Sequence, residues 1–273
     1  MEYCGNIRKM KTALDDGGNA QYHFILYDNL EAAHEIPMNE LVGKEINLRF
    51  EHQINCVVTG KKIRKPYGEG MSYDAFMESP MAVPSIIRPE LSQAHLGIGL
   101  RDLEWEIEHH VKPHYVYFSL TGDVKVGVTR DTQVPIRWID QGATEAIIFA
   151  KTPYRQAAGL IEVSLKEFMS DKTNWRNMLK NVFINTQSLQ EAKEEMLPKV
   201  TGDLSEFLVD DNTVTSIKYP VLQYPEKVKS MKFDKFPEIT KKLVGIKGQY
   251  LLFEDDTVIN IRSQSGYKIC LSV

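Results

Sequence analysis

Hydrophobic and polar positions follow different patterns along the chain. Residues 1–50 hold short runs such as "YHFILYD" and "EINLRF", in which apolar and polar positions alternate as they do in a half-buried strand. From residue 215 the chain again resembles strands and ends in "QYLLFEDDTVINIR", which predicts a hairpin with residues 254–256 at its turn. The sequence therefore predicts β-rich segments at both ends of the chain.

The stretch between these ends changes character at about residue 113. Residues 51–112 include "TGKKIRKPYGEG" and "MESPMAVPSIIRPE", which are rich in glycine, proline and charge and show little periodicity. After them the pattern predicts strand, turn, strand, short helix, strand and long helix, followed by a further helix at 189–199. We therefore expect an α+β fold with four parts. These are a β-rich segment at 1–50, an irregular segment at 51–112, a small β-β-α-β-α core at 113–200 and a β-rich segment at 201–273.

The two strands that open the core predict their own register. The residue types of Thr121-Gly122-Asp123 favour a turn, and a register centred on Gly122 places every apolar side chain on one face. That face pairs Leu120 with Val124, Phe118 with Val126 and Val116 with Val128. The opposite face pairs Ser119 with Lys125, Tyr117 with Gly127 and Tyr115 with Thr129.

Gly127 is unusual inside a strand, because glycine weakens a strand unless something needs the space. Opposite Gly127, the ring of Tyr117 has room to lie over the neighbouring backbone with its hydroxyl on the polar face. Two interpretations fit this pair. Tyr117 either serves a functional site, or simply covers a glycine and so protects the sheet.

The short helix that follows carries an arginine near its start. Pro135 and Gly142 suit its two ends and define a helix at residues 136–141. Arg137 in the first turn opposes the helix macrodipole, which indicates a bound anion or an acidic partner. An ion pair with Asp140 is the plainer alternative.

The long helix in "PYRQAAGLIEVSLKEFM" places a carboxylate at the margin of its apolar side. Ala158, Ile161, Leu165 and Phe168 recur at helical spacing and predict the buried stripe. Glu162 lies beside them. It can pair with Lys166 at i,i+4, or it can hold one Mg²⁺ whose remaining ligands are water.

In this order, these residues resemble the signature of the GIY-YIG nuclease superfamily over residues 113–180. Tyr115-Val116-Tyr117 matches the first triplet and Lys125-Val126-Gly127 the second. The chain departs from the motif at two positions: Tyr115 replaces the first glycine, and Lys125 replaces the first tyrosine, as in "KIG" subfamilies.

The resemblance implies a Mg²⁺-dependent phosphodiesterase (a hydrolase) that acts on nucleic acid. The catalytic residues it implies are Tyr117 beside the attacking water, Arg137 on the phosphate, Glu162 holding the metal, and Lys125. The substrate-binding residues it implies are Tyr115, Gly127, Thr129 and Asn174. The alternative is a weak or inactive nucleic-acid-binding or regulatory module on the same scaffold, and the missing tyrosine and acidic net charge favour it.

At full length the chain resembles the bacterial family labelled domain of unknown function 2797, through stretches such as "KVGVTRDTQVPIRWIDQGAT" and "YPVLQYPEKVKS". Relatives look as if they carry a cysteine-rich zinc module in the irregular segment. Here Cys56 remains, but Thr59 stands where a C-x-x-C would close, and Ser72 and Ala75 stand at the second spacing. One thiolate cannot supply four zinc ligands, so we expect no zinc.

Composition adds few constraints. The net charge of -4 is not typical of non-specific nucleic-acid binding, although residues 226–247 hold seven lysines against three acids. Nucleic-acid contact and solvated strand edges explain those lysines equally well. The three cysteines lie far apart in the sequence, and we expect a reducing, cytoplasmic location without a membrane partner. The sequence does not distinguish DNA, RNA and a small nucleotide as substrates, and it does not indicate the oligomeric state.

Overall fold

The computed structural model describes residues 1–184 and 187–273. It divides the chain into two compact units. The strand-rich unit comprises Met1–Met77, Leu179–Asn181 and Lys218–Val273, and the central unit comprises Glu78–Met178 and Val182–Ile217. The structure is mixed α/β, with more strand than helix. No helix among the described residues is long and apolar enough to cross a membrane.

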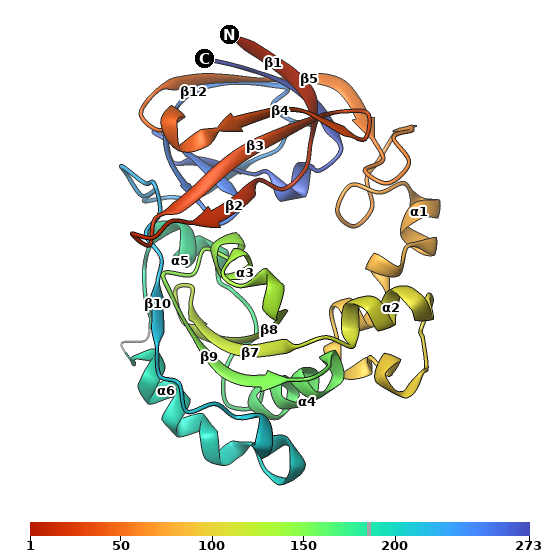
Figure 1. The fold of residues 1–273 in the computed structure, drawn as a ribbon. Coiled ribbons are helices and arrows are strands. Elements are labelled where there is room, and N and C mark those ends of the chain that lie inside the picture. The colour runs from red at the N-terminus through yellow and green to blue at the C-terminus, as the bar shows by residue number, and fades with distance from the viewer. Residues whose placement is uncertain (185–186) are drawn as a thin grey trace. The chain divides into compact units, whose positions relative to one another are not determined.

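The strand-rich unit is built on one sheet that both ends of the chain share (Figure 1). Its strands are β1 (Glu2–Ile7), β2 (Lys11–Leu14), β3 (Ala20–Asp28), β4 (Glu31–Pro37), β5 (Glu45–Asn55), β6 (Lys62–Ile63), β11 (Lys229–Met231), β12 (Glu238–Lys247), β13 (Tyr250–Phe253), β14 (Thr257–Asn260) and β15 (Tyr267–Ser272). The first strand, β1, pairs antiparallel with the last strand, β15, and β5 pairs with both β12 and β15. The alternating runs predicted at both ends are therefore confirmed as strands.

The central unit holds a second, four-stranded sheet in the order β10-β9-β7-β8. Its strands are β7 (His114–Leu120), β8 (Val124–Arg130), β9 (Glu145–Thr152) and β10 (Val214–Ser216). The helices are α2 (Leu103–His110), α3 (Ile136–Asp140), α4 (Arg155–Leu165) and α6 (Leu189–Met196); α1 (Tyr73–Glu78) and α5 (Trp175–Lys180) each run from one unit into the other. The predicted order of strand, turn, strand, short helix, strand and long helix is confirmed.

The register of the β7–β8 hairpin is the one that the sequence predicts. Tyr117 pairs with Gly127, Ser119 with Lys125, and the turn glycine Gly122 has a φ of +98°. A residue with a Cβ is strained at that φ, so glycine at the turn fixes where the strands reverse. Because side chains alternate between faces, fixing the turn also fixes which residues share the polar face.

The apolar face of this hairpin forms the core of the central unit. Val116, Phe118 and Val126 pack there with Ala158, Ile161 and Leu165 of α4 and with residues of α6. In Figure 1, α4 and α6 lie on one side of this sheet and α3 on the other.

One predicted member of the α4 stripe is wrong. Phe168 is 50% exposed, because α4 ends at Leu165 and the chain then turns away from the helical path. The apolar stripe of α4 therefore stops one turn earlier than the sequence predicts.

The segment predicted to be irregular holds the end of β5, the strand β6, the helices α1 and α2, and a series of short 3₁₀ turns, so it has more regular structure than its lack of periodicity predicts. The 3₁₀ turns lie at Pro80–Ala82, Pro84–Ile86, Pro89–Leu91 and Ala94–Leu96. The turn at residues 89–91 packs closely on α4, where Gln156 donates to the Glu90 carbonyl at 3.2 Å. This turn brings Glu90 beside α4.

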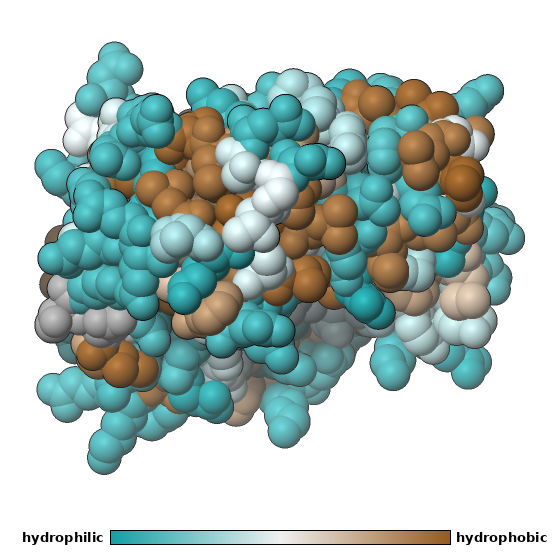
Figure 2. Space-filling view, turned by 90° about the horizontal axis from the view of Figure 1, so that it is seen from below, coloured by the Kyte–Doolittle hydropathy of each residue, from teal (hydrophilic) through white to brown (hydrophobic). Residues whose placement is uncertain are grey.

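Apolar side chains also reach the surface of the central unit. Leu160 and Val163 of α4 are each 42% exposed. Figure 2 shows several apolar areas separated by polar side chains on the face that it views.

Helix α4 packs so closely on the turn at residues 89–91 that position 159 has no room for a side chain. A Cβ at Gly159 would lie 2.2 Å from Glu90 N and 2.5 Å from Pro89 C, and these are backbone atoms that cannot rotate away. At an open helical site Gly→Ala stabilises by about 1 kcal/mol. We predict that Gly159→Ala instead destabilises the central unit by about 1–3 kcal/mol.

Chemical denaturation followed by tryptophan fluorescence measures this, because all three tryptophans, Trp105, Trp138 and Trp175, belong to the central unit. Ser164→Ala on the same helix is the control and should change the stability little. A Gly159→Ala protein more stable than the parent would show that the turn does not pack as described.

Candidate functional site

Tyr117 lies over Gly127, as the sequence predicts. A Cβ at Gly127 would meet the Tyr117 Oη at 2.7 Å and its Cζ at 2.8 Å, so only glycine leaves room for the ring. Tyr117 is fully buried, and its hydroxyl donates to Gln141 Oε1 at 3.0 Å. Burial raises the pKa of Tyr117, so the phenol is held in its neutral form.

Helix α3 supplies the groups that surround this tyrosine. The Trp138 ring packs edge-on against the Tyr117 ring at 6.0 Å between centroids, and Gln141 follows Arg137 by one helical turn. Gly142 ends the helix with a φ of +74°, as predicted. Arg137 in α3 and Gln141 directly after it therefore share one side, which faces the polar side of β7.

Lys125 is a buried cation on the same polar face. Only 4% of it is exposed, and neither an ion pair nor a hydrogen bond involves its side chain among the described residues. Burial, together with the smaller effect of the Arg137 charge, lowers the pKa of Lys125 to about 7. Asp171 and Glu162 act in the opposite direction but do not restore the usual pKa. Lys125 is therefore neutral in a large fraction of molecules near pH 7.

Glu162 is buried at the margin of the α4 stripe. It is 7% exposed, and its Oε2 lies 3.3 Å from Lys166 Nζ, so the i,i+4 pair is present. Lys166 also lies 3.2 Å from Asp171 and so divides its charge between two carboxylates. Burial raises the pKa of Glu162, Lys166 lowers it, and Asp171 and Glu90 raise it again. A second cation beside Glu162 would be favourable.

The charges of Arg137 and Glu162 both act on Tyr117 and Lys125. The charge of Arg137 lowers the pKa of both Tyr117 and Lys125, while that of Glu162 raises both. Arg137 itself is half-buried and has no ion pair among the residues described. Tyr117 and Lys125 therefore share the polar face of the hairpin, and α3 with Arg137 lies over that face. Glu162 lies on α4 on the other side of the sheet, and among the described residues its only direct partner is Lys166.

The other predicted site residues have different roles in the structure. Thr129 and Gly127 are buried on the hairpin, and the Tyr115 ring receives Lys151 Nζ at 5.5 Å from its centroid. Asn174 is exposed, and its Oδ1 accepts from Asn177 N at 3.3 Å at the start of α5. Asn174 therefore caps a helix in this structure.

The structure adds two polar groups near Tyr117 that the sequence does not predict as site residues. Ser119 Oγ and Trp138 Nε1 are buried and meet no hydrogen-bond partner among the described residues. Ser119 pairs directly with Lys125, so its place on the polar face follows from the strand register. Unpartnered donors in a protein interior call for water or a ligand.

Two further charged residues, Arg155 and Asp171, lie in the central unit around the site. Arg155 donates to the Ser85 and Ile86 carbonyls at 2.8 Å, and burial lowers its pKa to about 10. The chain after α4 runs beside β8, where Val126 N donates to Ser170 O at 3.0 Å. This contact holds Asp171 near Lys125.

Glu162 is the residue best placed to hold a metal ion here. One carboxylate with water and substrate phosphate oxygens is an ordinary set of Mg²⁺ ligands. Its burial and raised pKa fit a position whose negative charge gains from a nearby cation. Among the described residues, the one group of three metal-ligating side chains lies elsewhere, at Glu2, Cys4 and Cys270.

Comparison with family models matches residues 43–269 to the family described as "Protein of unknown function (DUF2797)". The chain belongs to the DUF2797 family. No curated protein and no solved structure matches the chain significantly. The match covers both the hairpin and α4, so all four proposed catalytic residues lie within the DUF2797 region.

Two buried histidines make the stability of this DUF2797 protein depend on pH. His110 and His114 are each at most 2% exposed, and burial lowers their pKa values to about 3 and about 4. The unfolded chain binds protons there below about pH 6.5, whereas the folded chain does not until its lower pKa values are reached. Above pH 6.5 the contribution of these two histidines to the free energy of unfolding does not change with pH. Below pH 6.5, each histidine lowers the free energy of unfolding by about 1.4 kcal/mol for each pH unit.

We therefore predict a loss of about 4 kcal/mol between pH 7.0 and pH 5.0 from these two histidines, measured by denaturation with tryptophan fluorescence. The variant His114→Gln should roughly halve this difference between the two pH values. His34→Gln, at an exposed position of the strand-rich unit, should leave it unchanged. An unchanged pH difference in His114→Gln would mean that His114 is protonated in the folded state.

Proposed function

We propose that the protein is a divalent-metal-dependent phosphodiesterase that cleaves nucleic acid. The observation that supports this most strongly is the pair of cations beside Tyr117, Lys125 and Arg137, which form no ion pair with any described residue and on which the buried Glu162 acts only at long range. An uncompensated buried cation costs several kcal/mol, and folding gains nothing from it. Groups whose pKa values are strongly shifted by burial cluster at functional sites.

The arrangement suits attack of water on a phosphodiester. Arg137 would bind the non-bridging oxygens of the phosphate and offset the charge that develops on them. Lys125, partly neutral near pH 7, would accept the proton of the attacking water, while the Tyr117 hydroxyl orients that water. A metal held by Glu162 would supply positive charge at the leaving oxygen. The new P–O bond forms as the bond to the leaving oxygen breaks.

A second candidate function has its own support. Tyr117, Lys125 and Glu162 are each at least nine-tenths buried, and Glu162 is already paired with Lys166. A nucleic-acid-binding module on the same scaffold would need no metal. Its carboxylate could then stay buried and paired with a lysine, as Glu162 is with Lys166. Catalysis and binding make opposite predictions at Glu162 and Arg137.

The first of these predictions concerns Glu162→Gln. If Glu162 holds the metal, this change should reduce Mg²⁺- or Mn²⁺-dependent cleavage at least about 100-fold, because a neutral amide is a far weaker metal ligand. The assay uses end-labelled single- and double-stranded DNA and RNA. Glu167→Gln, an exposed carboxylate close by in the sequence, is the matched control and should retain full activity. Equal rates for both variants would exclude Glu162 as the metal ligand.

Arg137→Ala separates the two functions. For an enzyme, it should lower kcat about 100-fold and weaken nucleic-acid binding only modestly, because the charge it offsets is greatest in the transition state. For a binding module, it should abolish binding, Glu162→Gln should leave binding unchanged or improve it, and no metal should support cleavage. Arg176→Ala, at an exposed arginine of the central unit, is the control for loss of a positive charge.

Lys125→Met tests whether Lys125 is held in the site at the expense of stability. The drop of its pKa from 10.5 to about 7 corresponds to several kcal/mol of unfavourable burial. The folded pKa is depressed, so stability rises with pH between about 7 and 10.5 in the parent. We predict that Lys125→Met raises the stability of the central unit at pH 7, reduces that rise and abolishes cleavage; buried Lys193, whose pKa is also lowered by burial, accounts for what remains of the rise. Lys166→Met, which loses two ion pairs, should not stabilise the unit. A destabilised Lys125→Met protein would assign Lys125 a structural role.

A further inference from the structure

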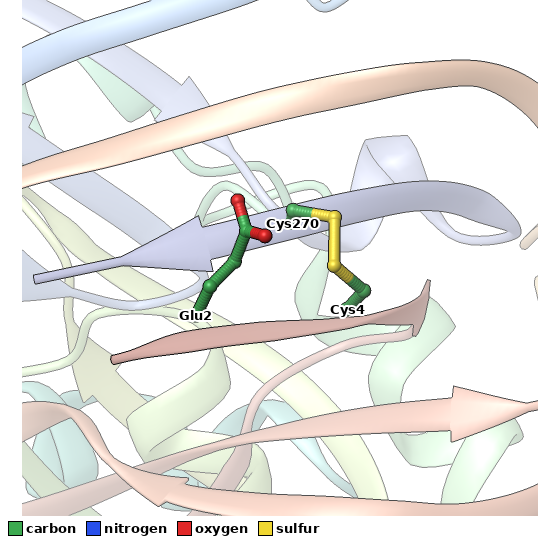
Figure 3. Close-up of side chains that lie close together, drawn as sticks. All are labelled: Glu2, Cys4 and Cys270. Atoms are coloured by element: carbon green, nitrogen blue, oxygen red, sulfur yellow. A yellow bond between two sulfur atoms is a disulfide. The ribbon is translucent and has the colours of Figure 1, made fainter.

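The two end strands of the chain bring a cysteine pair and a carboxylate together. Cys4 of β1 stands opposite Cys270 of β15 in the antiparallel register, and the two form a disulfide although they are 266 residues apart. The sequence alone gave no reason to pair them. Glu2 lies two residues before Cys4 on the same strand, so both side chains point to the same face. Figure 3 shows Glu2 beside the disulfide.

We propose that reduction of the Cys4–Cys270 disulfide creates a zinc site whose protein ligands are Cys4, Cys270 and Glu2. The two sulfur atoms and a carboxylate oxygen already lie within 4.8 Å of one another. A tetrahedral Zn²⁺ bound to two thiolates at about 2.3 Å and a carboxylate at about 2.1 Å needs the ligand atoms about 3.6–3.8 Å apart. The two sulfurs are bonded to each other in the disulfide, so after reduction they would have to separate by rotation of the Cys4 and Cys270 side chains. Water would complete the fourth position.

A dithiol can act as the reductant that converts the Cys4–Cys270 disulfide to two thiols. A thiolate of the dithiol attacks one sulfur of the protein disulfide, and its second thiol then displaces the remaining protein sulfur. The dithiol becomes a disulfide, and two electrons and two protons pass to Cys4 and Cys270 as two thiols. Zn²⁺ then displaces the two thiol protons, which leave to solvent.

The surroundings allow a metal to enter. Glu2 is exposed and Cys270 is buried, so the site has an open side and an anchored side. Arg49 lies 3.3 Å from Glu2 and 2.9 Å from Glu51. The Arg49–Glu2 contact is solvent-exposed, and such pairs contribute little stability, so Glu2 can exchange it for a metal. The positive charge of Arg49 also favours the thiolate forms that bind zinc.

This site is distinct from the segment at 51–112, which contains the remaining cysteine, Cys56. Cys56 is buried there and its sulfur accepts the Ser72 N–H at 3.1 Å. Thr59, Ser72 and Ala75 offer no further thiolates. Cys56→Ser is therefore the matched control for removal of a cysteine.

The test measures zinc bound by the full-length protein with a chromophoric chelator as competitor, after reduction and after oxidation. Reduced parent protein and Cys56→Ser should each bind one equivalent of Zn²⁺, and oxidised parent should bind none. Cys4→Ser and Cys270→Ser should lose the site, and Glu2→Gln should weaken binding about 10-fold or more, whereas Glu45→Gln should not. The melting temperature of reduced parent should rise on addition of zinc, and that of Cys4→Ser should not.

Three results would overturn the proposal. One is reduced parent protein that binds no zinc while remaining folded. Another is zinc that is lost in Cys56→Ser but kept in Cys4→Ser, which would place the metal in the irregular segment. The third is equal zinc binding by the oxidised and reduced proteins.

Discussion

The burial of Lys125 without a partner for its charge among the described residues is the constraint on which the candidate site depends. Lys125 stands on the polar face of the β7–β8 hairpin, where a tyrosine or an apolar residue would cost less. Its neighbours do not neutralise it: Arg137 adds to the repulsion, and Asp171 and Glu162 only moderate it. A folded chain that keeps this residue does so at a loss of stability, which indicates a requirement other than folding.

The rest of the site follows from the geometry around that hairpin. Gly127 opposite Tyr117 leaves room for the ring, and α3 then closes over it through Trp138 and Gln141. On the far face the apolar residues pack on α4, so that Glu162 lies at the margin of the core. One sheet therefore separates a conventional core from a face rich in polar and charged groups.

The sequence predicts those features of the site that depend on neighbouring residues, and it does not predict contacts between distant segments. The register was predictable because strand side chains alternate and Gly122 fixes the turn, and the Glu162–Lys166 pair was predictable because i,i+4 residues are neighbours on a helix. The closeness of Asp171 to Lys125 was not, because it depends on where the chain runs after α4. The Cys4–Cys270 pair was hidden for the same reason: 266 residues separate its members.

A crystal soaked with Mn²⁺ and a short oligonucleotide tests the central claim most directly. The account predicts an anomalous peak bound to the Glu162 carboxylate, with Lys166 displaced from it and a phosphate between the metal and Arg137. Ordered nucleic acid with Glu162 still paired to Lys166 and no metal beside it would contradict the account. In that case the buried charges of the β7–β8 face would serve binding and not cleavage.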